Sequence, residues 1–306
     1  MITYRITLQD HCRSTESFLL NMLPKASIGY IHKIIKNNHV KLNNKAATGE
    51  NLLCYGDEIA IKESGKMSSL LSAEKTGLDL LFEDDFIVVI NKKPGIPVHK
   101  TAEDKGKDLV TMTEEYFRNK EITCKLRPVN RIDKGTSGAV ILAKSATSAG
   151  ILGRFVKEEG LGKVYIAAVQ SGISQSGEIN IPLDGKESLT RYNCLIQGNK
   201  FSILAIYPLS GRMHQIRRHL SGVGYPIIGD LRYGGAKIKD YPGHALHAFI
   251  TSLKHPEQEK IITIHAPMPD YFISLLQKTG KENFAAFINS LPLLRRSLVK
   301  EDGLSL

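Results

Sequence analysis

The chain has 306 residues, of which 42% are hydrophobic and 24% are charged, a composition that predicts a folded globular protein with one large domain or two domains. Its formal net charge of +10 indicates attraction to polyanions, with nucleic acid ahead of anionic membrane surfaces. No apolar run approaches the roughly 18 residues that a membrane-spanning helix needs, and the N-terminus lacks the hydrophobic region of a signal peptide. We therefore expect a cytoplasmic protein with no membrane partner.

No pattern of cysteine, histidine or glycine indicates a metal or a nucleotide cofactor. Cys12, Cys54, Cys124 and Cys194 form no CxxC pair and have no nearby histidine at the spacing of metal ligands, so we expect buried free thiols. The glycine-rich loops that bind nucleotide phosphates, GxGxxG and GxxxxGK[ST], do not occur. We therefore expect neither a cofactor nor a metal.

Residues 14–62 predict a compact basic module in the order helix, helix, strand, strand. Ser14 can cap the first helix, and a second helix begins near Ser27, with isoleucines at helical spacing along one side. Lys33 and Lys36 lie off this apolar stripe. They can face an anionic partner, or they can simply be solvated, as charged runs usually are.

A hairpin completes this module, because Val40-Lys41-Leu42 is followed by a turn and by a closing strand at Glu58-Ile59-Ala60-Ile61. The order of elements resembles the S4 RNA-binding domain, in which a short helix pair presents basic side chains to RNA. The resemblance implies that residues 1–62 form an S4-like α/β domain and bind RNA through the lysines of the second helix. Ile28 is a departure, since that family commonly has an arginine there.

Residues 63–76 are small, polar and non-periodic, which predicts a linker. The second domain is expected over residues 77–275. It opens with the run Phe86-Ile87-Val88-Val89-Ile90, whose β-branched residues predict a buried strand. The loop after this strand carries Lys92, which we expect to contact phosphate. A helix is expected from about Asp108 to Lys120.

Asp133 lies in a polar loop, residues 127–138, that leads directly into the apolar segment 139–143. Arg131 and Lys134 flank it in sequence. A carboxylate beside two cations is expected to stay ionised at neutral pH, which suits a nucleophile or a base. Judged from these residues alone, a surface turn with an ordinary ion pair is an equal alternative.

Residues 163–169 alternate as a strand that carries Lys163 and Tyr165 on the same face. A strand tyrosine is usually a packing residue, and a base-stacking role requires that this face line a cleft. A second alternating strand, residues 201–207, precedes a ten-residue cluster with three arginines, two histidines and a glutamine. Arg217 in this cluster can reach a buried carboxylate, or the cluster can be a basic RNA-facing helix without a catalytic member.

The strands of the larger domain alternate with only a few helices, which favours an α+β fold with a mixed or mostly antiparallel sheet over a doubly wound parallel sheet. A strand from Ile261 to His265 closes this domain. Residues 276–306 look helical and add charge. We expect a C-terminal helical extension there and assign it no chemistry.

Five stretches appear in the order found in the RluA-type pseudouridine synthases, which the chain resembles over roughly residues 77–272. They are Asn91-Lys92-Lys93-Pro94-Gly95, Arg131-Ile132-Asp133-Lys134-Gly135-Thr136-Ser137-Gly138, Lys163-Val164-Tyr165-Ile166-Ala167, Gly211-Arg212-Met213-His214-Gln215-Ile216-Arg217 and His244-Ala245-Leu246-His247. With an S4-like domain ahead of them, they are similar to the subgroup that modifies large-subunit ribosomal RNA. The resemblance implies isomerisation of uridine within RNA: the C1′–N1 bond breaks, uracil rotates, and C5 joins C1′.

The resemblance also implies roles for individual residues. Asp133 occupies the position of the family's essential aspartate, Tyr165 that of its active-site tyrosine, and Arg217 that of the basic residue that pairs with the aspartate. Arg131 corresponds to the residue that enters the RNA stack where the target uridine is flipped out. Further RNA contacts are expected from Arg212 and His214.

The chain departs from the family pattern at several positions, and none of them removes a proposed catalytic group. Asn130, Ile132 and Gly135 replace a common histidine, leucine and acidic residue, respectively. Met213 replaces a common threonine and Lys93 a common proline. We expect these changes to alter loop rigidity or substrate choice.

Two alternatives to ribosomal RNA modification stay open at this point. A pseudouridine synthase acting on transfer RNA keeps the chemistry and changes the substrate. A non-catalytic RNA-binding or ribosome-assembly factor would bind RNA in a salt-dependent way and form no pseudouridine. The family resemblance implies a monomer in each case.

Overall fold

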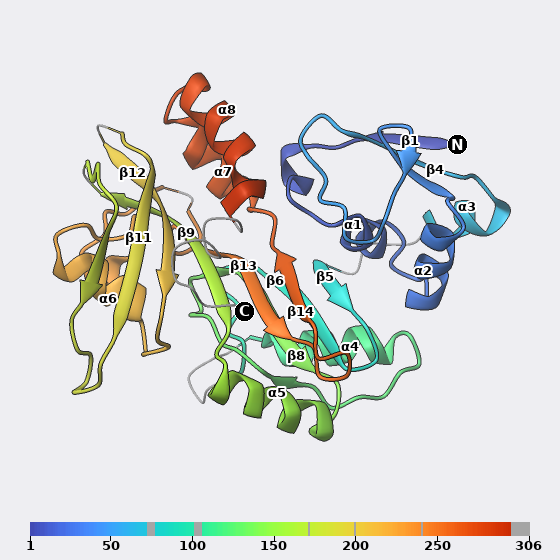
Figure 1. Ribbon diagram of the computed structural model, residues 1–306, viewed down its shortest axis with the longest axis horizontal. Coiled ribbons are helices and arrows are strands. Elements are labelled where there is room, and N and C mark those ends of the chain that lie inside the picture. Colours follow the sequence, from blue (N-terminus) through green and yellow to red (C-terminus); the bar gives the residue numbers. More distant parts are fainter. Residues whose placement is uncertain (72–76, 101–105, 171, 199, 240, 295–306) are drawn as a thin grey trace.

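The computed structural model describes residues 1–71, 77–100, 106–170, 172–198, 200–239 and 241–294, and Figure 1 shows how they are arranged. Two sheets organise the chain. A four-stranded sheet near the N-terminus has the order β1-β4-β2-β3, and a ten-stranded sheet organises the larger part. Among the helices of these described residues, none has the length and apolarity needed to cross a membrane.

The N-terminal module (residues 1–62) combines its small sheet with two helices. Its elements are β1 (Ile2–Arg5), α1 (Thr15–Met22), α2 (Ile28–Lys36), β2 (Val40–Leu42), β3 (Lys45–Ala46) and β4 (Glu58–Ile61), with a 3₁₀ turn at Leu8–Asp10. Ser14 and Ser27 cap the two helices, each accepting a hydrogen bond from a backbone N–H three residues on. The expected order of elements is present, and β1, which pairs with β4, precedes it. Strand β1 was not predicted, because its four residues alternate between half-buried and exposed and none of them is buried.

The ten-stranded sheet is mixed and mostly antiparallel, as predicted, with the order β10-β11-β12-β9-β13-β8-β6-β5, while β14 pairs with β13 and β7 with β8. In the described part of the chain, β13 and β8 run parallel and the other neighbours run antiparallel. The strands are β5 (Leu80–Glu83), β6 (Ile87–Lys92), β7 (Arg127–Pro128), β8 (Ser137–Ala143), β9 (Gly162–Gln170), β10 (Gly177–Asn180), β11 (Leu189–Ile196), β12 (Phe201–Pro208), β13 (Leu246–Lys254) and β14 (Ile261–His265). The remaining helices are α3 (Gly65–Leu71), α4 (Leu109–Arg118), α5 (Ala146–Glu158), α6 (Gln215–Gly222), α7 (Asp270–Gln277) and α8 (Lys281–Ser290), with 3₁₀ turns at Leu231–Tyr233 and Leu291–Leu293.

Both faces of the sheet are buried near β6 and β8, which explains why these strands read as continuous apolar runs. Along β6, Val88 and Ile90 pack in a core that also contains Phe117 of α4. The alternate residues of β6 pack in a second core that contains Leu152 of α5. Figure 1 shows α5 running below this part of the sheet and the N-terminal module lying beside β5. The centre of the sheet is therefore a rigid support for the loops at its strand ends.

The residues expected to form a linker are partly helical. Helix α3 begins at Gly65, its Met67 side chain is buried, and the Lys66 ammonium lies 4.7 Å from the centre of the Tyr30 ring in α2. The stretch therefore packs against the N-terminal module. At the other end, α7 begins at Asp270, earlier than the predicted extension, and α8 follows it. The remainder of both predictions, residues 72–76 and 295–306, lies outside the described residues.

Candidate active site

A cleft of about 1070 Å³ lies where the loop before β8, strand β9 and the start of α6 meet. Ligand pockets in proteins commonly measure about 300–1,000 Å³, so the cleft has the size of a ligand site. The cleft is lined by six of the residues named from the sequence: Arg131, Asp133, Tyr165, Arg212, His214 and Arg217. Three segments that are distant in sequence thus converge on one place.

The loop that carries Asp133 is held by hydrogen bonds from several directions. The Thr136 N–H closes a turn onto the Asp133 carbonyl at 3.0 Å. The Gly95 N–H donates to the Lys134 carbonyl at 2.7 Å, and the Thr136 hydroxyl lies 2.8 Å from His244 Nε2. The Asp133 side chain itself is 28% exposed. A partly exposed carboxylate is therefore presented to the cleft from a fixed backbone.

Lys92 corrects one of our expectations. The residue is 1% exposed, and its ammonium donates to the carbonyls of Lys93 at 3.0 Å, Ile96 at 2.8 Å and Lys134 at 3.2 Å. Burial lowers the pKa of Lys92 to about 7, while the charge of Asp133 acts in the opposite direction. The three acceptors match the three N–H groups of a charged ammonium. The predicted RNA contact by Lys92 is therefore wrong. Its ammonium is buried and joins the loop of Lys93 and Ile96 to the loop of Lys134.

Arg217 lies between two carboxylates. Its Nη1 is 2.8 Å from Asp133 Oδ2, while Nε and Nη2 donate to the two oxygens of Asp230 at 2.7 and 2.8 Å. Burial lowers the pKa of Arg217, but the hydrogen bonds to Asp230 and Asp133 raise it above its ordinary value. Burial raises the pKa of Asp230, yet the bonds and charge of Arg217 hold it below its ordinary value. Asp230 therefore fixes the guanidinium with one edge directed at Asp133.

Tyr165 and Lys163 share one face of β9 and both line the cleft. Tyr165 is 9% exposed, and burial, together with the charge of Asp133, raises the pKa of its phenol. The phenol therefore keeps its proton near neutral pH, so it can stack on a base or donate a hydrogen bond. Burial lowers the pKa of Lys163, which places a desolvated cation on the same wall.

The other residues expected to contact RNA divide into two groups. Arg131 and Arg212 are exposed at the cleft, where their guanidinium groups can meet phosphate or bases, and Arg212 Nε also donates to the Glu187 carbonyl at 3.2 Å. His214 directly precedes α6 and has a left-handed backbone and a half-buried ring, whose Nδ1 lies 2.8 Å from the Tyr233 hydroxyl and whose Nε2 lies 3.9 Å from Asp133. Lys33 and Lys36 are exposed on α2, away from the residues that line the cleft.

Asp230 and His244 were not identified as site residues from the sequence. Asp230 follows an apolar segment and has no local pattern that reveals its partner, because its contact with Arg217 forms only when the chain folds. His244 belongs to the motif His244-Ala245-Leu246-His247, but the sequence did not show that its ring lies against the loop that carries Asp133. Gly135 is the relevant neighbour, since a Cβ there would lie 2.7 Å from the His244 ring.

Comparisons with known proteins agree with this geometry. A family model described as RNA pseudouridylate synthase matches residues 86–222. A ribosomal large subunit pseudouridine synthase C from Buchnera aphidicola subsp. Schizaphis graminum is 31% identical over 300 residues, covering 85% of this chain and 92% of that protein. A ribosomal large subunit pseudouridine synthase D from Buchnera aphidicola subsp. Acyrthosiphon pisum is 28% identical over 288 residues, with 85% and 92% covered.

Solved structures share the fold. The human protein RNA pseudouridylate synthase domain containing 4 superposes with a TM-score of 0.56 at 23% identity, covering 65% of this chain and 92% of that one. The human protein RNA pseudouridylate synthase domain containing 1 gives a TM-score of 0.55, also at 23% identity, with 72% and 97% covered.

Proposed function

The chain belongs to the RNA pseudouridine synthases of the RluA type and is thus an RNA-modifying isomerase; from this premise we propose that it modifies large-subunit ribosomal RNA with Asp133 as its catalytic carboxylate. The 2.8 Å pair between Asp133 and Arg217 at the wall of the cleft is the observation that carries the assignment of Asp133. The names of two relatives, both ribosomal large subunit synthases, support the substrate class.

Asp133 starts the reaction at the ribose of the flipped uridine. In one route its carboxylate attacks C1′, and the C1′–N1 bond breaks with its electron pair leaving on uracil. In the other route it removes the proton from C2′ while the C1′–N1 bond breaks, which leaves a C1′–C2′ double bond. In both routes uracil rotates within the cleft and C5 bonds to C1′; this step breaks the Asp133–C1′ bond in the first route, and in the second it returns the proton to C2′. The proton at C5 is then lost and N1 gains one. The atoms of substrate and product are the same, so no co-reactant is required.

Arg217 and Tyr165 support this carboxylate in different ways. The buried guanidinium keeps Asp133 oriented by a charge-assisted hydrogen bond, in a position fixed by Asp230. Tyr165, which is protonated and nearly buried, supplies a flat surface on which uracil stacks while it rotates. Both side chains also exclude water from one side of the reacting sugar.

RNA is held by two basic surfaces. Arg131 and Arg212 are exposed at the cleft, where we assign Arg131 to the gap left by the flipped uridine and Arg212 to the flanking backbone. Lys33 and Lys36 of the N-terminal module, which we interpret as an S4-like domain, contact phosphate at a distance from the site of reaction.

A tritium-release assay tests the role of Asp133, because substitution at C5 of labelled uridine releases tritium. With large-subunit ribosomal RNA as substrate, Asp133→Asn is expected to lower release by at least about 100-fold, the ordinary contribution of a group that acts on the reacting atoms. The matched control is Asp184→Asn, which breaks an exposed Asp–Arg pair of the same 2.8 Å length and should release tritium like wild type. Equal release from Asp133→Asn and wild type would overturn the assignment.

A further inference from the structure

The N-terminal module is docked on the edge of the large sheet through α1. Strand β5 is the last strand of that sheet, so the outward N–H and C=O of Leu80 would otherwise be unpaired. The Asn21 side chain accepts from the Leu80 N–H at 2.9 Å and donates to the Leu80 carbonyl at 2.7 Å. The Ser17 hydroxyl donates to the same carbonyl at 2.6 Å. Side chains of α1 thus take the place of a further strand.

An ion pair with a buried guanidinium and a half-buried carboxylate closes the same interface. Arg13 is 6% exposed and donates from Nη1 and Nη2 to the two oxygens of Asp79 at 2.7 and 3.1 Å, while its Nε donates to Asp10 at 2.9 Å. One continuous cluster of buried apolar side chains includes residues of both modules. Forked contacts of this kind fix an orientation as well as a distance. The module is therefore held in one position relative to the sheet.

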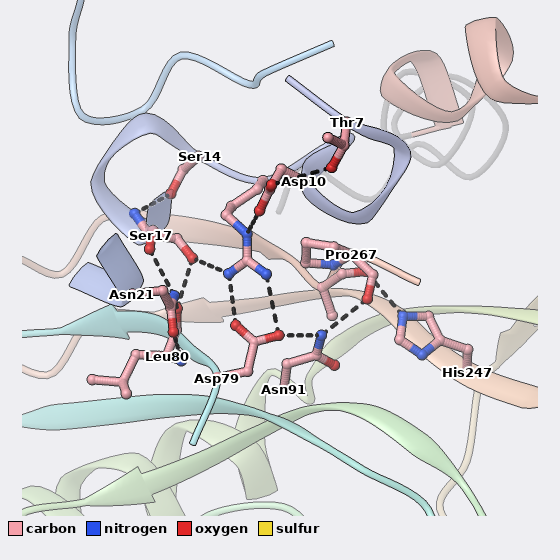
Figure 2. A network of polar contacts seen from close by, with 12 residues as sticks. Thr7, Asp10, Ser14, Ser17, Asn21, Asp79, Leu80, Asn91, His247 and Pro267 are labelled. Atoms are coloured by element: carbon pink, nitrogen blue, oxygen red, sulfur yellow. Dashed lines mark hydrogen bonds and ion pairs between the residues drawn. The ribbon is translucent and has the colours of Figure 1, made fainter. Parts of the chain in front are cut away.

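The interface leads to the loop that carries Asp133. Figure 2 shows Asn91 beside Asp79, where its amide donates to Asp79 Oδ2 and to the Pro267 carbonyl, each at 2.9 Å. The next residue along β6 is Lys92, which points to the other face of the sheet because successive strand residues alternate. Its ammonium donates to the Lys134 carbonyl, next to Asp133. Two consecutive residues at the end of β6 thus touch the module interface and the catalytic loop.

A second connection runs through a buried histidine. The Ala266 carbonyl, which precedes Pro267, lies 2.9 Å from His247 Nε2, and His247 Nδ1 lies 2.9 Å from the Ser137 hydroxyl. Ser137 begins β8 directly after the catalytic loop. Figure 2 shows His247 and Pro267 on the same side of the network as Asn91.

We propose that the Arg13–Asp79 pair couples docking of the N-terminal module to catalysis, in that the docked module fixes the end of β6 and thereby the position of Asp133. Arg13 is then a positioning residue, although it lies outside the cleft. Releasing the module slows the chemical step itself, in addition to weakening RNA binding. This inference rests on the proposed function, because its main readout is the rate of pseudouridine formation.

Single-turnover kinetics with saturating enzyme separate chemistry from binding, and hydrogen exchange at the Leu80 amide reports whether the module is docked. The variants are Arg13→Gln, which removes the charge, and Arg13→Lys, which keeps it and loses the fork. The control is Asp184→Asn, which breaks a forked Asp–Arg pair of similar geometry, with distances of 2.8 and 3.1 Å, outside the interface. A cooperative thermal transition shows that each variant is folded. If Arg13→Gln does not fold, Arg13→Lys is the variant that tests the proposal.

Arg13→Gln is expected to expose the Leu80 amide to exchange and to lower the saturated rate about tenfold, within the ordinary range of coupling between sites. Arg13→Lys should fall between it and wild type in both measurements. The Asp184→Asn control should react at the wild-type rate and keep the Leu80 amide protected.

A module that is released while the saturated rate stays at the wild-type value would overturn the coupling and leave the proposed function standing. Unchanged exchange at Leu80 in Arg13→Gln would overturn the role of Arg13 in docking. A wild-type enzyme that forms no pseudouridine would instead contradict the proposed function, and the exchange measurement would still decide whether Arg13 holds the module.

Discussion

Asp133 and Asp230 share one guanidinium, and their different surroundings suggest different tasks. Asp230 is buried with a 1% exposed side chain and uses both oxygens on Arg217. Asp133 uses one oxygen on Arg217, and its side chain is 28% exposed at the cleft. Asp133 is therefore free to meet a substrate, whereas Asp230 serves to position the arginine.

Replacing Asp230 tests this division at the scale of single residues. In Asp230→Asn the bidentate anchor of Arg217 is lost, so its contact with Asp133 loosens and the saturated rate should fall by roughly 10- to 100-fold, as expected when a reacting group is misplaced by about 1 Å. Substrate affinity should change little. Asp184→Asn is again the matched control. An unchanged rate in Asp230→Asn would show that Arg217 needs no such anchor.

Asp133, Tyr165 and Arg217 could be proposed together from the sequence because each lies in a motif with a recognisable order, and the structure places all three at one cleft. Asp230 and Lys92 show what such motifs cannot predict. A lysine in a polar loop reads as exposed, yet Lys92 is buried by three carbonyls that come from segments folded around it. Side-chain direction and long-range pairing are properties of the folded chain and leave no local pattern.

At the scale of elements, the loop that carries Asp133 depends on close contact between β8 and β13. Gly138 has a φ of +116°, and a Cβ there would lie 2.3 Å from the Ala248 carbonyl oxygen. The parallel pair of β8 with β13 includes this position, immediately after the loop that carries Asp133. A side chain at Gly138 would therefore separate the strands that hold the loop.

Two glycine substitutions test this contact. Gly138→Ala should lower the free energy of unfolding by roughly 2 kcal/mol or more, because the strain and the clash add. Gly150→Ala, at an exposed position of α5 with nothing within 4 Å of an added Cβ, should raise it by about 0.5–1 kcal/mol. Urea denaturation measures both. A loss of equal size in the two variants would contradict the role given to Gly138.

The elements that were predicted are those with a strong apolar pattern. The runs that form β6, β9 and β12 are buried on both faces, and such burial favours apolar residues at nearly every position. Helix α5 was missed because its buried residues are Ser148 and Leu152 alone, and because Gly150 and Gly153 interrupt its sequence. Strand β11 was missed because most of its side chains are half-buried, so neither face is marked.

At the scale of the whole molecule, two buried histidines link stability to pH. Burial lowers the pKa of His244 and of His247 to about 4 in each case. Their ordinary value is about 6.5, so between pH 4 and 6.5 the unfolded chain binds more protons than the folded one. Stability is then fully present above pH 6.5 and is lost as the pH falls towards 4.

His247→Gln tests this linkage. Each such proton contributes a slope of about 1.4 kcal/mol per pH unit to the free energy of unfolding in this window. Between pH 4.5 and 6 the variant should reduce this slope by close to 1.4 kcal/mol per pH unit, the contribution of one proton. Between pH 7 and 8 the slope should stay unchanged. Denaturant titrations across this range measure it. A slope equal to that of wild type would show that His247 is not held neutral by burial.

The central claim is that the enzyme forms pseudouridine in large-subunit ribosomal RNA with Asp133. Pseudouridine mapping of ribosomal and transfer RNA tests it most directly, in cells that lack the gene and carry either the wild-type chain or Asp133→Asn. We expect one or more pseudouridines of large-subunit ribosomal RNA to disappear without the gene and to return with wild type alone. Sites lost only from transfer RNA, an unchanged map, or restoration by Asp133→Asn would contradict the account.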